Sequence, residues 1–281
     1  RSFAGNKVIY HFFNREMIKT KYKGGETLEE KYKKDPMKMW KDVCKIDRRK
    51  CQPPAPIDVF ELNRSITFFK PSIAKHIYER FNATSVLDPC AGWGSRMLGA
   101  MCLGIHYQGF ETNTNLIVPY KKMRESFDVP ICAMEGPVGL NVEFKSCMDA
   151  KFSDYEYDCV LTSPPYYDLE IYPNQEKLPT ECVWYRTFLM AMIARSFKYM
   201  KPGGHCCINM SPKMYDKMMG YKFPPCDMKI DFLQQKNSNN KGAHSPLSPG
   251  YPVSHLIDKQ DYIDVWKKPE WSNGPLWKKP S

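Results

Sequence analysis

Polar and aromatic side chains accompany two prolines in one short segment, Thr-Ser-Pro-Pro-Tyr-Tyr at residues 162–167. Pro164 and Pro165 restrict the backbone, so the Ser163 hydroxyl and the Pro164 carbonyl can hold one partner without moving. Two acceptors at one point suit an exocyclic amine on a heteroaromatic ring, because hydrogen bonds from both N–H groups would redirect the nitrogen lone pair. Tyr166, or the tyrosine after it, could stack on that ring. The segment is also consistent with a rigid loop at the end of a strand.

A second segment places an acid, a turn and two glycines between an apolar run and the start of a helix. Its sequence is Val-Leu-Asp-Pro-Cys-Ala-Gly-Trp-Gly-Ser-Arg over residues 86–96. Glycines let the backbone approach a ligand closely, and amides at a helix start point toward it. A tight turn would also explain the glycines, whereas a dinucleotide motif would require a third glycine at Met97. The residues that we expect to contact a ligand here are Asp88, Pro89, Cys90, Ala91, Gly92 and Gly94.

Two further acids follow the next apolar runs along the chain. Glu111 ends the run Tyr-Gln-Gly-Phe-Glu, where a carboxylate can accept hydrogen bonds from both hydroxyls of a ribose. Asp149 follows the third run, where it could accept from an adenine amino group or cap a helix. Together with the glycine segment, these acids predict a site for a ligand that contains adenosine.

The glycine segment resembles the cofactor-binding motif Asp-Pro-x-x-Gly-x-Gly of S-adenosylmethionine-dependent DNA amino-methyltransferases. Upstream, Phe-Lys-Pro at residues 69–71 is similar to the Lys-Pro motif that precedes it in many of these enzymes. By this resemblance, Lys70 and Pro71 lie beside the methionine end of the cofactor. The chain departs from the pattern at Cys90 and Trp93, where the family more often has an aromatic residue and a small residue, respectively.

The segment at 162–167 resembles the (Asp/Asn/Ser)-Pro-Pro-(Tyr/Phe) motif of the same enzymes, and its Thr-Ser form is most typical of N4-cytosine enzymes. The resemblance implies catalytic roles for Ser163, Pro164, Pro165 and Tyr166, with Ser163 also near the cofactor. It covers roughly residues 66 to 210, with a weaker match at residues 261–268.

What the resemblance implies is methyl transfer from S-adenosyl-L-methionine to an exocyclic amino group of a base, with N4 of cytosine in DNA favoured. N6 of adenine in DNA and an amino group of RNA are the alternatives, and sequence alone hardly separates DNA from RNA. A third hypothesis is an inactive subunit that binds the cofactor and presents nucleic acid or regulates a partner. We expect no metal in the site.

Apolar periodicity predicts strands that alternate with helices. The expected strands are 84–87, 106–110, 142–146, 158–161, 205–209, 228–233 and 262–266; the expected helices are 65–81, 95–103, 116–127 and 181–200. This alternation predicts an α/β fold with a Rossmann-like, seven-stranded methyltransferase sheet, mainly parallel and closed by an antiparallel terminal strand pair. Ligands of such sheets bind at the carboxyl ends of the strands.

The formal net charge is +10, and most of the excess lies near the N-terminus. Residues 1–50 hold 15 Lys or Arg against 7 Asp or Glu, an excess of 8 (15 − 7). We expect residues 1–60 to form a basic appendage that binds nucleic-acid phosphates or a lysine-rich surface with helix-surface ion pairs. Residues 61–281 would form the methyltransferase domain, with 212–257 as a target-recognition insert.

The eleven cysteines contain no Cys-x-x-Cys pair, which indicates reduced thiols rather than a disulfide or zinc framework. No apolar run reaches the ~18 residues that span a bilayer. We therefore expect an intracellular protein of the cytoplasm or nucleus that does not bind membranes. The oligomeric state is not predicted.

Overall fold

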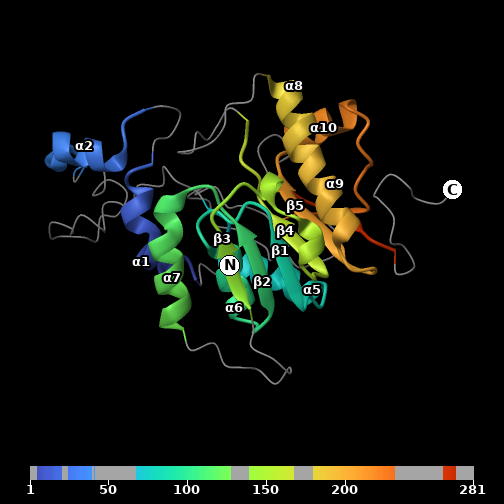
Figure 1. The fold of residues 1–281 in the computed structure, drawn as a ribbon. Helices are drawn as coiled ribbons and strands as arrows, with labels where there is room; N and C mark the ends of the chain where they lie inside the picture. Colours follow the sequence, from blue (N-terminus) through green and yellow to red (C-terminus); the bar gives the residue numbers. More distant parts are fainter. Residues whose placement is uncertain are drawn as a thin grey trace, which may run out of the picture.

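The computed structural model describes residues 5–20, 25–39, 41, 68–127, 139–167, 180–231 and 262–269. Its strands form one seven-stranded sheet in the order β3-β2-β1-β4-β5-β7-β6 (Figure 1). The strands are β1 (Ser85–Asp88), β2 (His106–Phe110), β3 (Leu140–Glu143), β4 (Cys159–Thr162), β5 (His205–Met210), β6 (Met228–Asp231) and β7 (Tyr262–Lys267). Only β7 runs antiparallel to its neighbours β5 and β6. The predicted Rossmann-like methyltransferase sheet, mainly parallel with an antiparallel terminal pair, is confirmed.

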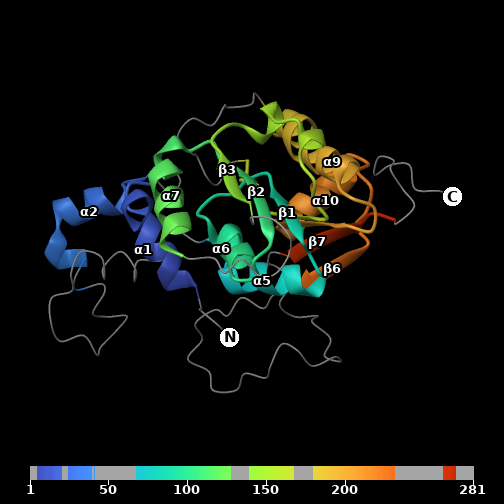
Figure 2. The ribbon, with the colours of Figure 1, turned by 60° about the horizontal axis from the view of Figure 1, so that its bottom comes forward.

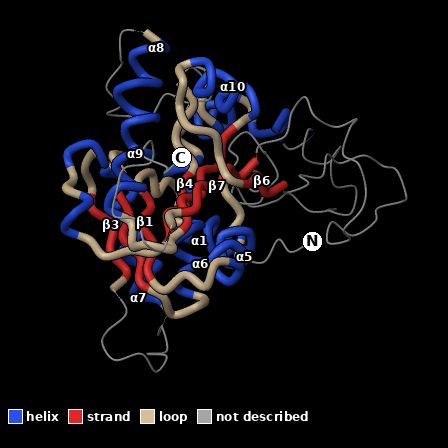
Figure 3. The backbone as a smooth tube through the Cα atoms, turned by 90° about the vertical axis from the view of Figure 1, so that its right-hand side faces the viewer, coloured by secondary structure: helices blue, strands red, loops and turns tan. Residues whose placement is uncertain are grey.

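Helices cover both faces of the sheet (Figures 2 and 3). They are α1 (Asn6–Met17), α2 (Leu28–Lys34), α5 (Pro71–Arg80), α6 (Ser95–Met101), α7 (Ile117–Ser126), α8 (Glu181–Trp184), α9 (Met190–Tyr199) and α10 (Pro212–Gly220). Successive strand residues alternate between two cores, as pleating requires. In β4, Cys159 and Leu161 face the core of α1, α5, α6 and α7, whereas Val160 faces the core of α9 and α10.

The first helix belongs to one of these two cores. α1 lies against α7 in both Figure 1 and Figure 2, with Ile9 and Phe13 fully buried. The Phe13 ring meets the Tyr120 ring edge-on at 5.1 Å between centroids and the Trp93 ring at 6.4 Å. The boundary predicted near residue 60 lies outside the described residues, but α1 itself packs against α7 and shares one hydrophobic core with Val86 and Leu161 of the sheet.

Helix α2 carries three lysines of the basic segment, Lys31, Lys33 and Lys34, and begins with a reciprocal cap. The Thr27 hydroxyl accepts from the Glu30 amide at 3.0 Å, and the Glu30 carboxylate accepts from the Thr27 amide at 2.8 Å. Lys33 pairs with Glu29 at 3.0 Å, so the helix-surface pairs considered from the sequence do form. The exposed Lys31 and Lys38 add positive charge to the same region.

Element boundaries differ from the sequence predictions where polar side chains terminate an element. β3 ends at Glu143 rather than at residue 146, because the Ser146 hydroxyl accepts from the Met148 amide and starts a 3-10 turn, Cys147–Asp149. The predicted helix 181–200 contains a π-helical turn, Tyr185–Leu189, between α8 and α9.

The predicted insert, residues 212–257, begins as α10 and β6, and its remainder beyond Asp231 lies outside the described residues. All cysteines in the described part of the chain are free thiols. No helix within the described ranges has the length and apolarity needed to cross a bilayer.

Candidate active site

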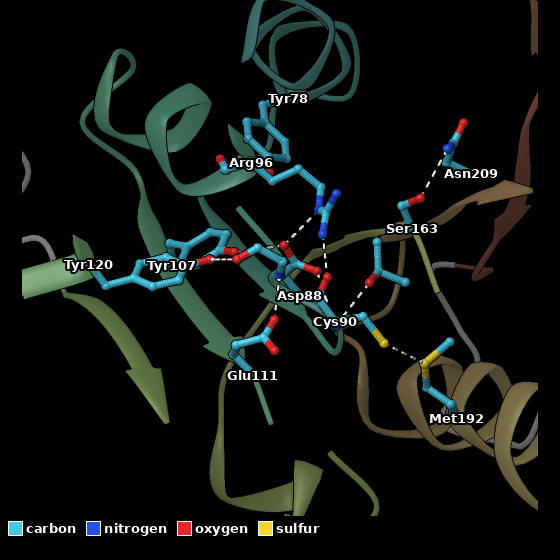
Figure 4. A network of polar contacts seen from close by, with 12 residues as sticks. Tyr78, Asp88, Cys90, Arg96, Tyr107, Glu111, Tyr120, Ser163, Met192 and Asn209 are labelled. Atoms are coloured by element: carbon cyan, nitrogen blue, oxygen red, sulfur yellow. Dashed lines mark hydrogen bonds and ion pairs between the residues drawn. The ribbon is translucent and has the colours of Figure 1, made fainter. Parts of the chain in front are cut away.

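The carboxyl ends of the parallel strands β1, β2, β4 and β5 meet at one edge of the sheet. The loop after β1, residues 89–94, leads into α6 and is called the glycine loop here. Glu111 follows β2, Ser163 follows β4, and Asn209 is the penultimate residue of β5. Figure 4 shows side chains from all four strands within one network of polar contacts.

The glycine loop has a backbone that side chains would disturb. Gly92 and Gly94 have φ angles of +58° and +74°, in the left-handed region. A Cβ on Gly94 would lie 2.9 Å from both the Phe13 ring and the Met123 methyl group. A Cβ on Gly92 would meet no atom nearer than 3.9 Å. The loop therefore packs tightly against α1 and α7 at Gly94 and is less crowded at Gly92.

Asp88 is fully buried and holds the base of this loop (Figure 4). Its carboxylate accepts from Arg96 Nε at 2.7 Å, from the Tyr107 hydroxyl at 2.6 Å and from the Cys90 amide at 3.3 Å. These three bonds connect β1, β2 and α6. Asp88 thus organises the loop from behind, and a direct contact between its carboxylate and a cofactor stays a prediction.

Arg96 is the ion-pair partner of Asp88, and it was not predicted from the sequence as a site residue. Its side chain is 5% exposed, and its guanidinium also donates to the Cys90 carbonyl. Burial alone would lower the pKa of Arg96, but the adjacent Asp88 carboxylate raises it above its ordinary value. One sequence signal could have indicated this pair: an arginine near the start of a mostly apolar helix, eight positions after Asp88.

Glu111, the residue after β2, holds the glycine loop through a hydrogen bond. Its carboxylate accepts from the Gly92 amide at 2.7 Å and from the Asn113 amide at 2.8 Å. Burial raises the pKa of Glu111 from its ordinary value, while the backbone hydrogen bonds oppose that shift. Because a carboxylate has about four acceptor sites, it can hold both amides and still accept from ligand hydroxyls.

The Thr-Ser-Pro-Pro-Tyr segment is joined directly to the glycine loop. The Cys90 amide donates to the hydroxyl of Thr162, the buried last residue of β4, at 3.1 Å. One residue further, Ser163 Oγ accepts from Asn209 Nδ2 at 3.1 Å. The sequence predictions assigned no role to Thr162 or Asn209. Each of them bonds to a residue of a different segment, Cys90 or Ser163, so no single motif contains both partners.

The remaining catalytic candidates lie in the same segment. Pro164 is buried, while Pro165, Tyr166 and Tyr167 are half-buried. Both tyrosines pack against the core of α9 and α10, and the Tyr167 ring lies 6.1 Å from that of Trp184 on α8. Both tyrosines are therefore partly exposed beside the candidate catalytic serine.

Three other predicted residues lie at the ends of elements. Pro71 is the first residue of α5 and is buried, and Lys70 precedes it in an extended conformation. Asp149 is exposed at the end of the 3-10 turn that Ser146 caps. The alternative prediction, that Asp149 caps a helix, is wrong, because the capping residue of this turn is Ser146.

Cys90 belongs to the glycine loop, and its sulfur lies 3.9 Å from that of Met192 on α9. A hydrogen bond with Cys147 and burial raise the pKa of the Cys90 thiol well above its ordinary value. The thiol stays protonated at neutral pH, which argues against a nucleophilic cysteine. The described ranges contain no cluster of His, Cys, Asp and Glu side chains that could hold a metal ion.

No family model and no curated protein matches the chain. Solved structures do resemble it. An RNA methyltransferase from Salinibacter ruber, in complex with S-adenosyl-L-homocysteine, is 14% identical over 73% of this chain and 95% of that one, with a TM-score of 0.40.

A tRNA (m1A58) methyltransferase, TrmI, from Aquifex aeolicus is 11% identical over 73% of this chain and 72% of its own, with a TM-score of 0.43. An S-adenosylmethionine-dependent O-methyltransferase from Thermotoga maritima has the same identity and TM-score over 77% and 72% of the two chains. Likeness at this level does not indicate a substrate, and the fold assignment rests on the strand order.

Proposed function

We propose that this protein is an S-adenosylmethionine-dependent methyltransferase that acts on an exocyclic amino group of a nucleic-acid base. The observation that carries the proposal is the hydrogen bond of 3.1 Å between the Cys90 amide and the Thr162 hydroxyl. It joins the loop expected to hold the cofactor to the segment expected to hold the amine, at the sheet edge where such folds bind ligands.

The residues present fit the cofactor. Glu111 supplies a carboxylate for ribose hydroxyls, and Gly92 has a backbone with room beside it. The residues that would hold the cofactor are Lys70, Pro71, Asp88, Pro89, Cys90, Ala91, Gly92, Gly94, Glu111, Asp149 and Ser163. When bound, S-adenosylmethionine supplies an electrophilic methyl group on a sulfonium sulfur.

The protein's own contribution is to position the amine. Ser163 Oγ and the Pro164 carbonyl accept its two N–H groups, which turns the nitrogen lone pair out of conjugation with the ring. Pro165 keeps this part of the backbone stiff. Tyr166 or Tyr167 stacks on a base that has been turned out of a helix or taken from a single strand.

The favoured target is N4 of cytosine in DNA. A serine hydroxyl at position 163 is shorter and uncharged, so it accepts from the amine without placing negative charge beside the cytosine acceptors N3 and O2. Adenine also presents an amine beside a ring nitrogen, and the Pro164 carbonyl would serve either base. N6 of adenine is therefore the second choice.

The test is a methyl-transfer assay with tritiated S-adenosylmethionine on PCR-amplified DNA and on RNA of the same sequence, followed by mass spectrometry of the nucleosides. We expect N4-methylcytosine from DNA. Ser163→Ala should reduce turnover far more than it reduces cofactor affinity, and Tyr166→Ala should weaken base engagement by about 1 to 3 kcal/mol if that tyrosine stacks.

Each other outcome has a definite meaning. Methyl label only on adenine would refute the cytosine assignment, and label only in RNA would refute DNA as the substrate. If the folded protein binds S-adenosylhomocysteine but labels neither polymer, the inactive-subunit hypothesis replaces this one.

A further inference from the structure

Asn209 holds the serine of the candidate catalytic segment and lies on a different strand from it. Its Nδ2 donates to Ser163 Oγ at 3.1 Å (Figure 4). The pairing follows from the parallel register of β4 and β5, in which Leu161 lies opposite Cys207 and Thr162 opposite Ile208. The next step of that register brings Ser163 beside Asn209.

The backbone that carries Asn209 is well fixed. β5 lies between β4 and β7, and in the second pairing Asn209 lies opposite Ile263. Ser163, by contrast, has already left its strand and lacks ladder hydrogen bonds of that kind. A rigid amide donor next to a serine on irregular backbone restricts the rotation of the serine hydroxyl.

The direction of this hydrogen bond determines what the hydroxyl can still do. A serine hydroxyl has two lone pairs and one proton. The bond from Asn209 occupies one lone pair, which leaves one lone pair for an amine N–H and the hydroxyl proton for an acceptor. Cytosine and adenine both have a ring nitrogen acceptor next to the amine, so the remaining capacity of Ser163 matches an amine and its neighbouring ring nitrogen.

We propose that Asn209 is a positioning residue for the proposed methyl transfer, and this inference rests on that proposed function. Its amide fixes the Ser163 hydroxyl so that the oxygen accepts from the target amine while the hydroxyl proton is donated to the adjacent ring nitrogen. Asn209 acts through Ser163 and does not itself touch the reacting atoms.

The experiment measures kcat and KM for the nucleic acid that the wild-type protein methylates, with tritiated S-adenosylmethionine as the methyl donor. Asn209→Ala should lower kcat about 2- to 10-fold, the loss expected for one hydrogen bond, with little change in KM. Affinity for S-adenosylhomocysteine, measured by calorimetry, should be unchanged. In a Ser163→Ala background the same substitution should lower kcat no further.

Two variants separate positioning from a structural role and from the opposite bond direction. Asn141→Ala is the matched control, because Asn141 also donates an amide hydrogen bond between strands, to Gln108 at 2.9 Å, at the far end of the sheet. It should leave kcat unchanged. Asn209→Asp keeps the size but cannot donate when ionised, so its kcat should be at least as low as that of Asn209→Ala.

Three results would overturn the inference. The first two are a kcat equal to that of the wild-type protein in Asn209→Ala or in Asn209→Asp. The third is a drop in kcat on adding Asn209→Ala to Ser163→Ala that is as large as the drop in the wild-type background. Absence of methyl transfer by the wild-type protein to both DNA and RNA would instead overturn the proposed function, and the role of Asn209 with it.

Discussion

The buried pair of Asp88 and Arg96 gives the most specific prediction about stability. Both Asp88 and Arg96 are buried, with 2.7 Å between the carboxylate oxygen and Nε. Asp88→Asn keeps the shape of the side chain but removes its charge. The amide oxygen can still accept from Arg96 Nε and the Tyr107 hydroxyl, whereas the other position becomes an NH2 group that faces the Cys90 amide, and Arg96 loses its counter-charge.

The magnitude follows from what is left unpaired. A hydrogen bond to a charged group contributes about 1.5 to 3 kcal/mol. Removal of one partner of a buried ion pair also strands the other charge, for a total of about 3 to 5 kcal/mol. Against a total stability of about 5 to 15 kcal/mol, Asp88→Asn should shift the urea midpoint strongly.

Two comparisons make the assay decisive. Glu79 pairs with Lys75 on the surface of α5, where both side chains are more than 40% exposed, so Glu79→Gln should cost at most about 0.5 kcal/mol. Adding Arg96→Met to Asp88→Asn removes the stranded charge and should recover part of the loss. If Asp88→Asn and Glu79→Gln shift the urea midpoint equally, the reasoning about this buried pair is wrong.

Other consequences concern the cofactor, the core, pH and the basic segment. Because burial raises the pKa of Glu111, affinity for S-adenosylhomocysteine should fall as the pH drops through that raised pKa; calorimetry should show weaker binding and no such pH dependence in Glu111→Gln. Phe13→Ala should cost about 3 to 5 kcal/mol in urea unfolding and also weaken cofactor binding, because the Phe13 ring backs the glycine loop; unchanged affinity in the folded variant would contradict that coupling. Burial raises the pKa of Asp264 to about 6, above its unfolded value, so its ionisation opposes folding: stability should decline by about 2 to 3 kcal/mol as the pH rises from 4 to 7, and Asp264→Asn should remove this decline. Replacing Lys31 and Lys38 with Gln should reduce the salt slope of nucleic-acid binding by about 2, and an unchanged slope would indicate an ordinary solvated surface.

Much of the sheet could be predicted because apolar periodicity and breaker residues act locally. The strand at residues 205–210 follows Lys-Pro-Gly-Gly, which ends the preceding helix, and it was placed to within one residue. The third strand was placed less well, because the Ser146 hydroxyl starts a turn where the apolar pattern alone would continue.

The relation of α1 to the sheet could not be predicted. The lysines and arginines of residues 1–50 made the N-terminal segment look like a separate surface, whereas Phe13 of α1 is buried against Trp93 and Tyr120. Local sequence reveals that a helix has an apolar face, but the surface that this face covers depends on the packing of the whole chain.

For the candidate site, the sequence by itself determined the order of the motifs along the chain. The glycine loop, Glu111 and the segment at 162–167 each follow a predicted parallel strand, and parallel strands end at the same edge of a sheet. Only the tertiary structure decided which side chains bond to one another there. Asp88 pairs with Arg96 across a turn, the Cys90 amide reaches Thr162, and Asn209 reaches the serine after β4. The last two contacts depend on strand order and register, and these arise when the sheet assembles from segments distant in sequence.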